Sequence, residues 1–379
     1  MKKVSTAVKN SYLKLIHLLS QRPVQKKKVV FLLSFPTTSN IILDHLAPHF
    51  KHELVIGYTA NSEQVAQSYQ RFGCNTYSLA AKKIFSSNIV ALTKNADVVL
   101  CDNYFAFLAG IQFSNRTAVV QLWHAAGAAK SFGLEANYAK AQSNADKERY
   151  QAVYNRFTHY VIGSKKMKTI FENSYHAKKA EFLPFGYLPT DIYFDSELKR
   201  QNKKQFIARF GTKKTLLYAP TYRESYETPL LDFTSLRQKL GTEWQLLAQA
   251  HPHDKILQAK LAAHEDVITS FDSLSLPALL QNVDCLISDY SSVPFEYALA
   301  NPGGKLLYYC PDFNQYNETV GLQQNFGESL QKAIVIKETE LVDRILDYPY
   351  KNLVDFNNMW NTYNTGNAHK QLIGWIENR

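Results

Sequence analysis

Short apolar runs alternate with longer amphipathic segments along most of the chain after Pro23. The runs have the length of buried strands, and the segments between them have helical spacing. Strands that alternate with helices indicate βαβ units and therefore a parallel sheet. The predicted strands are Val29–Phe35, Glu53–Tyr58, Asp97–Cys101, Ala118–Leu122, His159–Ile162, Thr215–Ala219, Trp244–Ala250, Asp266–Thr269, Cys285–Ser288 and Lys305–Tyr309, and the predicted helices include Asn61–Phe72, Ala139–Phe157, Leu198–Lys214 and Leu276–Asn282.

The alternating pattern occurs twice, on either side of a segment near residues 184–190. With 379 residues, the chain is long for one core and suits two domains. We therefore predict an α/β fold with a first domain over residues 26–190 and a second over residues 191–350. Residues 351–379 form a helical, aromatic segment, and its return to the first domain is left open.

An amphipathic helix is predicted within residues 1–25. Its apolar positions recur at helical spacing, and lysines lie off that face or flank it. Such a basic amphipathic helix can lie in a membrane interface, and packing on its own domain is an equally supported alternative. The apolar positions are Val4, Val8, Tyr12, Leu15, Ile16 and Leu19, and the basic ones are Lys2, Lys3, Lys9, Lys14, Arg22 and Lys26 to Lys28.

Positive charge is concentrated in the first half of the chain. Residues 1–190 contain 24 Lys and Arg against 10 Asp and Glu, whereas residues 191–379 contain 19 against 23. This asymmetry indicates that the first half meets an anionic partner, which could be a membrane surface, a nucleic acid or a phosphorylated substrate. A generally basic proteome would also produce it.

Composition excludes several classes of protein. The chain is 45% apolar, which excludes a disordered protein. We expect no membrane-spanning segment, because no run of 18 apolar residues occurs. We expect no signal peptide, because Lys9, Lys14 and His17 interrupt the apolar residues at the start and no small-residue cleavage site follows. The 4 cysteines are far apart, so neither a disulfide scaffold nor a cysteine zinc site is expected, and a reducing cytoplasmic setting fits best.

A histidine directly follows the predicted strand Ala118–Leu122. Ligands bind outside the carboxyl ends of parallel strands, and His124 is followed there by small residues that let a ligand approach the backbone. Its imidazole can act as a general base near neutral pH. Lys130 could hold a phosphate. A buried histidine, hydrogen-bonded at a domain interface, is the alternative.

Polar residues also follow two strands of the second half. Thr221 and Arg223 come after Thr215–Ala219, and arginine offers a planar fork that suits phosphate, although a surface ion pair is the commoner role. His251 follows Trp244–Ala250. The pair His251 and His253 resembles a metal-binding pair, but no third ligand is evident and no metal site is predicted.

The strand Cys285–Ser288 ends in a polar cluster before a helix that we expect to start near Pro294. Ser291 or Ser292 can cap that helix, whose free N–H groups would attract an anion. Asp289 and Glu296 could accept hydrogen bonds from sugar hydroxyls. An ordinary serine cap explains the serines alone but not the two carboxylates. No glycine-rich phosphate loop occurs.

Four segments, in this order, resemble one enzyme family. They read Q-L-W-H-A-A-G at 121–127, A-P-T-Y-R at 219–223, H-P at 251–252 and S-D-Y-S-S-V-P-F-E-Y at 288–297. In these four segments, the chain is similar to the CDP-glycerol glycerophosphotransferases of wall teichoic acid synthesis. The variant W-H-A-A-G-A-x-K-x-F-G looks most like the branch that adds the first glycerol phosphate.

The resemblance implies two Rossmann-like domains facing a cleft, the GT-B type of fold. It also implies a peripheral enzyme on the cytoplasmic face of the cell membrane. That enzyme would transfer glycerol phosphate from CDP-glycerol to N-acetylmannosaminyl-N-acetylglucosaminyl diphospho-undecaprenol and release CMP. No cofactor is firmly implied, and Mg²⁺ on the donor diphosphate stays open.

The resemblance also assigns roles. His124 would be the base for the acceptor hydroxyl, and His251 would contact or neutralise the donor diphosphate. Ser291 and Ser292 would bind phosphate. Thr221 and Arg223 would support the donor site. Asp289 and Glu296 would contact ribose or glycerol hydroxyls.

Other functions stay open. They are a glycerol-phosphate or ribitol-phosphate polymerase, a nucleotide-sugar glycosyltransferase, a nucleic-acid binder and an inactive scaffold. No nucleic-acid motif is present, so we expect no nucleic-acid partner.

Overall fold

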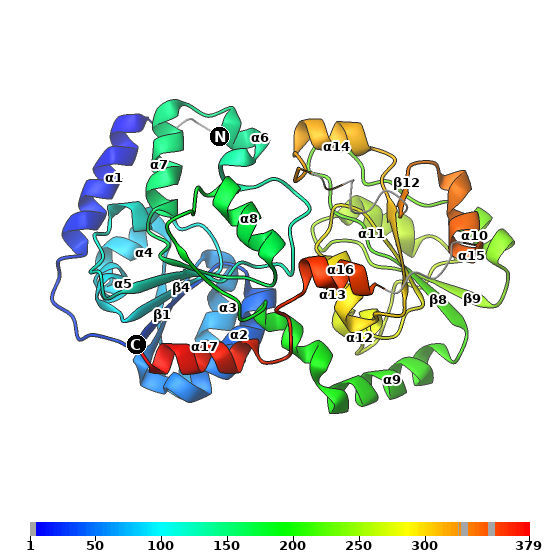
Figure 1. Cartoon of the computed structure of the whole chain (residues 1–379), viewed down its shortest axis with the longest axis horizontal. Coiled ribbons are helices and arrows are strands. Elements are labelled where there is room, and N and C mark those ends of the chain that lie inside the picture. The colour runs from blue at the N-terminus through cyan, green and yellow to red at the C-terminus, as the bar shows by residue number, and fades with distance from the viewer. Residues whose placement is uncertain (1–4, 325, 327–332, 348–352) are drawn as a thin grey trace. The chain divides into compact units, whose positions relative to one another are not determined.

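The computed structural model of the chain describes residues 5–324, 326, 333–347 and 353–379. These residues divide into two compact units, each with its own sheet (Figure 1). Unit 1 comprises Met1–Ala125, Phe132–Asp191 and Tyr363–Arg379, and unit 2 comprises Ala126–Ser131 and Ile192–Thr362. Some predictions lie outside the described residues. They concern Lys2, Lys3 and Val4 and the undescribed parts of 191–350 and 351–379.

Unit 1 is built on a parallel sheet with the strand order of a Rossmann fold. Over the described residues its seven strands run in the order β3-β2-β1-β4-β5-β6-β7. Almost every residue of the central strands is buried, as parallel strands covered on both faces require. The strands are β1 Val29–Leu33, β2 Leu54–Tyr58, β3 Asn75–Ser78, β4 Val98–Cys101, β5 Ala118–Gln121, β6 His159–Val161 and β7 Glu181–Leu183.

Some helices of unit 1 begin at residues that suit the first turn of a helix. Ser143 accepts a hydrogen bond at the start of α7, Ser164 does so at the start of α8, and Pro36 is the first residue of α2. The helices are α1 Thr6–Leu19, α2 Pro36–Phe50, α3 Glu63–Ser68, α4 Ala81–Ser86, α5 Ile89–Asn95, α6 Asn137–Lys140, α7 Asn144–Tyr154, α8 Lys165–Ser174 and α17 Ala368–Glu377.

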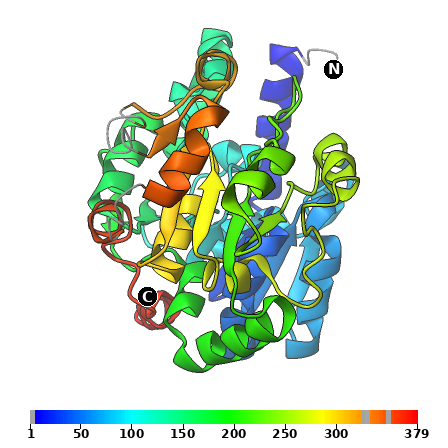
Figure 2. The same ribbon diagram turned by 90° about the vertical axis from the view of Figure 1, so that its right-hand side faces the viewer.

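Unit 2 is a second, smaller parallel sheet, turned toward the viewer in Figure 2. Its described strands run in the order β12-β11-β10-β8-β9, which is the flavodoxin-like order, and α10, α11 and α15 pack on one face. The elements are β8 Lys214–Tyr218, β9 Trp244–Ala248, β10 Cys285–Ser288, β11 Lys305–Tyr309, β12 Ile334–Val335, α9 Ser196–Phe210, α10 Phe233–Leu240, α11 Lys255–Ala262, α12 Leu276–Leu280, α13 Val293–Ala300, α14 Phe313–Thr319, α15 Leu341–Asp347 and α16 Val354–Trp360.

Most predicted strands are present within two residues of their expected ends, and two Rossmann-like α/β units are confirmed. The strand predicted at Asp266–Thr269 is wrong, because only Ile268 forms an isolated bridge, to Leu247. The strands β3, β7 and β12 were not predicted. They lie at sheet edges, and their partly exposed residues do not form an apolar run.

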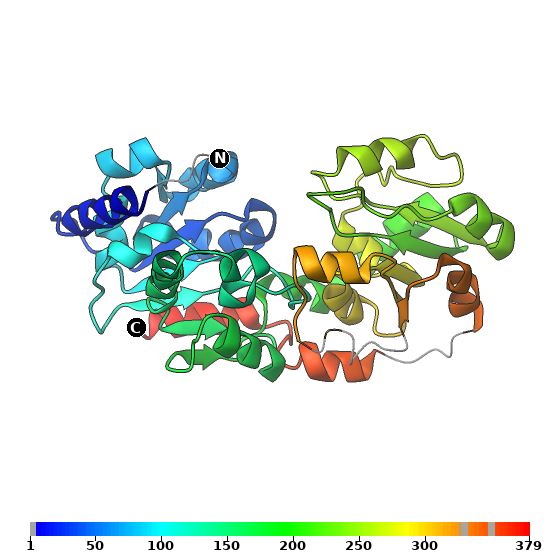
Figure 3. The same ribbon diagram turned by 90° about the horizontal axis from the view of Figure 1, so that it is seen from above.

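The chain passes between the units at places that differ from the predicted domain limits. The main passage lies between Asp191 and Ile192, one residue after the expected end of the first domain. The segment Ala126–Ser131 belongs to unit 2, which corrects its assignment to the first domain. Residues 363–379 return to unit 1, where α17 lies beside its other elements (Figure 3). Leu372 and Ile376 of α17 are buried in the core that α2 and β1 also form.

The N-terminal helix α1 packs on unit 1 and still exposes apolar side chains. Ile16 and Leu19 are buried, whereas Val8 is 58% exposed, Leu15 41% and Leu18 66%. The predicted apolar face therefore divides, because α1 packs against α5 and the 3-10 helix η4, Ala106–Gly110, with Ile16 and Leu19 buried while Val8 and Leu15 stay exposed. Among the described residues, no helix is long and apolar enough to cross a membrane.

Candidate functional site

Each sheet reverses its strand order once, and polar side chains gather at both reversals. In unit 1 the order reverses between β1 and β4, and in unit 2 it reverses between β8 and β10. Ligands of open parallel sheets bind at such points, outside the carboxyl ends of the strands, because the connections on either side run away from each other and leave a crevice. The loops after these four strands are therefore the first places to look for chemistry.

In unit 1, His124 lies just after β5, with its ring orientation set by the loop after β4. Its Nδ1 lies 3.0 Å from the backbone oxygen of Asp102. A carbonyl oxygen can only accept, so Nδ1 carries the proton and donates it, and the neutral ring has its lone pair on Nε2. The ring stacks on Phe35, with centroids 3.9 Å apart. Burial lowers the pKa of His124 to about 4, partly opposed by the hydrogen bond to Asp102, so the imidazole is neutral at pH 7.

The carboxylate of Asp102 holds the neighbouring loop after β1. It accepts hydrogen bonds from the backbone N–H groups of Ser34 and Phe35 and from the hydroxyl of Ser39, at 2.8–3.0 Å. Burial raises the pKa of Asp102 to about 6, and these donors partly offset that rise. Asp102 thus orients His124 through its carbonyl and places the supporting Phe35 ring through its carboxylate. It was not predicted, although it directly follows a strand just as His124 does.

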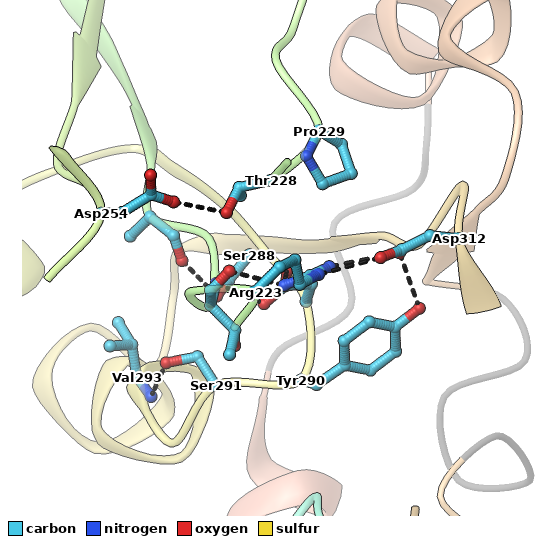
Figure 4. A network of polar contacts seen from close by, with 12 residues as sticks. Arg223, Thr228, Pro229, Asp254, Ser288, Tyr290, Ser291, Val293 and Asp312 are labelled. Carbon is cyan, nitrogen blue, oxygen red and sulfur yellow. Dashed lines mark hydrogen bonds and ion pairs between the residues drawn. The ribbon is translucent and has the colours of Figure 1, made fainter. Parts of the chain in front are cut away.

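In unit 2, Arg223 is fully buried between two carboxylates, and its contact with Asp312 is drawn in Figure 4. Its Nη1 lies 2.7 Å from Asp289, and its Nε lies 2.9 Å from Asp312. The rings of Tyr290 and Tyr316 lie 5.1 and 4.7 Å from its Cζ. Burial opposes the charge, but the two carboxylates raise the pKa of Arg223 above its usual value. Each guanidinium nitrogen has a protein partner, so Arg223 fixes the loop after β8 rather than presenting a free fork.

The same network places the backbone of Thr221. Asp289 accepts a hydrogen bond from the Thr221 N–H at 2.9 Å, and Nη1 of Arg223 donates to the Thr221 carbonyl at 2.6 Å. Both oxygens of Asp289 are therefore engaged by protein groups, whereas we expected contact with a sugar hydroxyl. The Thr221 hydroxyl is buried and has no hydrogen-bond partner among the described residues. Such a group is costly unless a water or ligand completes it.

A cavity of about 850 Å³ opens beside this network within unit 2. The half-buried Lys130 reaches it from the segment that bridges to Leu322, and its ammonium has no carboxylate or hydrogen-bond acceptor within the described part of the chain. Burial lowers the pKa of Lys130, and Asp289 partly opposes this. The cavity is lined by Lys130, Thr221, Tyr222, Arg223, Glu224, Ser225, Tyr226, His251, His253, Tyr316, Thr319 and Val320. It joins an ammonium without an ion pair among the described residues to a hydroxyl without a hydrogen bond, which suits an anionic ligand.

His251 lies at the cavity in the tautomer opposite to that of His124. Its Nδ1 accepts a hydrogen bond from the backbone N–H of His253 at 3.2 Å. The neutral ring therefore carries its proton on Nε2 and can donate it to a ligand oxygen. The ring stacks between Tyr222 and His253. Burial, His253 and Lys130 lower the pKa of His251, in that order, and Asp254 partly opposes this.

The remaining predicted residues do not line the cavity. Ser291 lies before the N-cap of α13, and its hydroxyl accepts from the N–H of Val293, the first residue of that helix, at 3.2 Å. Ser292 precedes the helix and makes no side-chain cap. Glu296 accepts a hydrogen bond from the Tyr193 hydroxyl at 2.7 Å, and burial raises the pKa of Glu296. Their proposed ligand contacts stay predictions.

The structure thus gathers four predicted residues, Lys130, Thr221, Arg223 and His251, around one cavity. Asp312 and Tyr316, which complete that site, were not predicted. Asp312 follows the predicted strand Lys305–Tyr309 closely, so the search for polar residues after strands could have found it. Tyr316 lies on α14 and carries no comparable sequence signal.

The chain is similar along its whole length to enzymes of known name. The family model described as CDP-Glycerol:Poly(glycerophosphate) glycerophosphotransferase matches residues 16–378. The chain is 30% identical to the teichoic acid glycerol-phosphate primase of Bacillus subtilis (strain 168), with 99% of both chains covered. It is 31% identical to that of Bacillus spizizenii (strain ATCC 23059 / NRRL B-14472 / W23), with 93% of this chain and 92% of the relative covered.

Two solved structures share the fold. The wall teichoic acid polymerase TagF superposes with a TM-score of 0.72 at 16% identity, covering 100% of this chain and 98% of that one. The UDP-GlcNAc 2-epimerase from Neisseria meningitidis superposes with a TM-score of 0.56 at 14% identity, covering 94% and 100%. The match of the family model to nearly the whole chain is decisive: the chain belongs to the CDP-glycerol:poly(glycerophosphate) glycerophosphotransferase family and is a CDP-glycerol glycerophosphotransferase of teichoic acid synthesis.

Proposed function

We propose that the chain transfers one glycerol phosphate from CDP-glycerol to N-acetylmannosaminyl-N-acetylglucosaminyl diphospho-undecaprenol and releases CMP. The observation that carries the proposal is the state of His124, a neutral, half-buried imidazole whose Nε2 lone pair is left for a substrate proton. A general base must have that lone pair free at the working pH. The cavity with Lys130 and Thr221 supplies the complementary place for an anionic donor.

The proposed reaction is an in-line displacement at the phosphorus that bears glycerol. An acceptor hydroxyl oxygen forms the new P–O bond, and its proton passes to Nε2 of His124. The bond between that phosphorus and the oxygen bridging to CMP breaks, and CMP leaves with the bridging oxygen and its electron pair. The protonated His124 then returns its proton to solvent or product, which restores the base.

Charge on the departing CMP is offset by groups of unit 2 in this proposal. The ammonium of Lys130 supplies a positive charge with no carboxylate partner among the described residues, and Nε2–H of His251 and the Thr221 hydroxyl supply hydrogen bonds. Such preorganised donors stabilise developing charge strongly in a partly dry site. The proposal also includes phosphate contacts of Ser291 and Ser292 and hydroxyl contacts of Asp289 and Glu296.

Transfer of a single unit is favoured over polymerisation by the extent of the similarity. The alignment covers 99% of the Bacillus subtilis primase but only 36% of the Bacillus spizizenii poly(ribitol-phosphate) polymerase. The chain thus matches the whole of a primase and a part of that polymerase. Glycerol as the transferred group is favoured likewise, because the ribitol-phosphate primase matches over 58% of its length.

We also propose that the protein acts as a peripheral enzyme at an anionic membrane surface, on its cytoplasmic face. The support is the exposed apolar row of α1, Val8, Leu15 and Leu18, beside the exposed Lys14. Leu18→Glu should reduce co-sedimentation with vesicles that contain anionic phospholipid, and Ile336→Glu, at another exposed apolar residue, should not. Wild-type protein that stays in the supernatant would contradict the proposal.

Participation of Mg²⁺ in donor binding stays a separate proposal. Of the described residues that line the cavity, Glu224 alone carries a carboxylate, so a hard cation there would take most of its oxygen ligands from the donor diphosphate and water. Removal of divalent cations with a chelator should then lower the rate of transfer, and added Mg²⁺ should restore it. An unchanged rate would assign charge neutralisation to Lys130 and its neighbours.

The decisive experiment measures CMP release from CDP-glycerol with a soluble analogue of the lipid-linked disaccharide and resolves the products by mass. We expect one added glycerol phosphate. His124→Ala should lower turnover by roughly 10²–10⁴ while CDP-glycerol still binds. His52→Ala, at an exposed histidine of the same unit, is the matched control.

Three outcomes would contradict parts of the proposal. A ladder of additions would indicate a polymerase. Nucleotide release from CDP-ribitol or a nucleotide sugar, but not from CDP-glycerol, would show that the proposed donor is wrong, although the fold would still be consistent with the result. Near-normal turnover of His124→Ala would exclude this residue as the base.

A further inference from the structure

Unit 1 contains a second cavity, of about 400 Å³, that the proposed chemistry does not use. It lies between α1, α7, and η4 together with the loop that leads into η4. This volume is within the range of about 300–1,000 Å³ that small-molecule sites occupy. Its walls are mostly apolar and aromatic, and they consist of Val8, Lys9, Tyr12, Leu13, Tyr104, Ala106, Ala109, Asp146, Arg149 and Tyr150.

Aromatic rings give the cavity a defined shape. Tyr104 packs edge to face against Tyr150, with ring centroids 5.9 Å apart, and edge to face against Tyr154, with ring centroids 5.8 Å apart. Tyr12 completes the aromatic wall from α1 and itself contacts Phe85. A hydrocarbon chain would gain both buried apolar area and contact with these ring faces.

The cavity also carries two cations and one carboxylate. Lys9 Nζ and Arg149 Nη2 both lie 2.5 Å from the same oxygen of Asp146. One carboxylate cannot balance two cations, so the site keeps a net positive charge. An anionic head group could bind both cations at once. The cavity therefore suits an amphiphile with an apolar chain and a negatively charged head.

The cavity is coupled along the chain to the candidate base. The Asp102 carbonyl that orients His124 is followed two residues later by Tyr104, which lines the cavity. Two residues of extended chain span at most ~7 Å. The Gln121 side chain, from the strand that precedes His124, also donates to the Asn103 carbonyl between them. A ligand held in the cavity would thus lie on the same loop as the group that receives the acceptor proton.

We propose that this cavity binds the hydrocarbon chain of a prenyl diphosphate, the class of lipid that would carry the acceptor sugar, with its isoprene units against the tyrosines and its diphosphate at Lys9 and Arg149. The assignment rests on the proposed function for the identity of the lipid. It assigns acceptor recognition to the lipid part of the substrate and not only to its sugars.

The test uses the full chain with farnesyl diphosphate as the probe, titrated in a calorimeter with the donor cavity occupied by saturating CDP-glycerol. We expect farnesyl diphosphate to bind at least tenfold more tightly than inorganic diphosphate, because only the former fills the apolar walls. Ala106→Phe adds a ring at an exposed position of the cavity wall and should weaken the binding of farnesyl diphosphate at least tenfold. Ala60→Phe, at an exposed alanine elsewhere in unit 1, should not.

A second measurement needs no variant. A benzophenone-bearing farnesyl diphosphate should crosslink to peptides that contain Val8–Leu13, Tyr104–Ala109 or Asp146–Tyr150. Equal binding by wild type and Ala106→Phe, or crosslinks confined to other peptides, would overturn the assignment.

Turnover separates this proposal from the proposed function. Ala106→Phe should raise KM for a long-chain prenyl acceptor and leave KM for CDP-glycerol and for a short-chain acceptor unchanged. If farnesyl diphosphate binds as expected but no acceptor is glycerophosphorylated, the cavity assignment stands and the proposed function fails. If transfer is normal and Ala106→Phe changes neither binding nor KM, the cavity assignment fails alone.

Discussion

At the scale of single residues, backbone partners decide what the two candidate histidines can do. His124 faces a carbonyl oxygen, which forces its proton onto Nδ1 and leaves Nε2 as a base. His251 faces a backbone N–H, which forces its proton onto Nε2 and makes that atom a donor. The same side chain is thus prepared for proton acceptance in unit 1 and for hydrogen-bond donation in unit 2.

The first prediction concerns the protonation of His124. Because burial lowers its pKa to about 4, its imidazole should stay neutral from pH 8 down to about 5, whereas an unperturbed histidine takes up a proton near 6.5. Nitrogen-15 NMR of histidine-labelled protein should show the Nδ1–H tautomer over this range, with the His124→Ala spectrum as the assignment control. Titration near 6.5, or an Nε2–H tautomer, would contradict the geometry.

The second prediction concerns Arg223 and its two carboxylates. Arg223→Met would leave the buried Asp289 and Asp312 without their counter-ion, which typically costs about 3–5 kcal/mol of unfolding free energy. Urea unfolding followed by tryptophan fluorescence should show the loss, since Trp244 is buried in unit 2. Arg209→Met removes an exposed ion pair with Asp272 and should cost at most about 1 kcal/mol. Equal effects of the two substitutions would refute a structural role for Arg223.

At the scale of elements, a close approach to one glycine determines how α1 sits on unit 1. A Cβ atom at Gly110 would lie 2.7 Å from the Leu13 carbonyl oxygen and 2.9 Å from Ile16. Both contacts are to α1, and the first is to backbone, which cannot rotate away. The helix that borders the second cavity is therefore held by a position that tolerates no side chain.

The third prediction follows from this contact. Gly110→Ala should displace α1, with a cost of about 1–3 kcal/mol for overpacking, and should speed amide hydrogen exchange in residues 6–19. Gly374→Ala is the control, because nothing lies within 4 Å of its Cβ position and alanine favours a helix. Unchanged exchange in α1 after Gly110→Ala would show that the helix is not held there.

At the scale of the whole molecule, the chain returns to its first unit at the end. Ala368, Leu372 and Ile376 of α17 are fully buried in the same core as β1 and α2, nearly the whole chain length away in sequence. Asp191, the last residue of unit 1 before the chain leaves it, accepts from the N–H groups of Ala368 and His369 at the start of α17. Unit 1 is complete only when the C-terminal helix has docked.

The fourth prediction tests this dependence. Leu372→Ala should lower the unfolding free energy of unit 1 by about 2–5 kcal/mol, the usual cost of a cavity left by a buried leucine. Thermal unfolding of the full chain, followed by the fluorescence of Trp375, should show that unit 1 unfolds at a lower temperature than in the wild type. Lys370→Ala, at an exposed position two residues earlier, should leave the transition in place. A transition unchanged by Leu372→Ala would mean that α17 does not contribute to that core.

The sequence by itself determined the α/β class, most buried strands and the positions of several candidate residues. Parallel strands covered on both faces are read as apolar runs, and polar residues that follow such runs lie by geometry at the ligand-binding edge. Half-exposed edge strands such as β3 and β7 have no such run and were missed. Residues on helices, such as Tyr316, have no strand end to mark them.

Only the tertiary structure decided what those residues do. It paired Arg223 with Asp289 and Asp312, left the Thr221 hydroxyl without a hydrogen bond and the Lys130 ammonium without an ion pair among the described residues, and gave His124 and His251 opposite tautomers. These outcomes depend on contacts between segments far apart in sequence, and on burial, which shifts pKa values. A single sequence records local preference and periodicity, but it does not record which distant donor or carboxylate a side chain will meet.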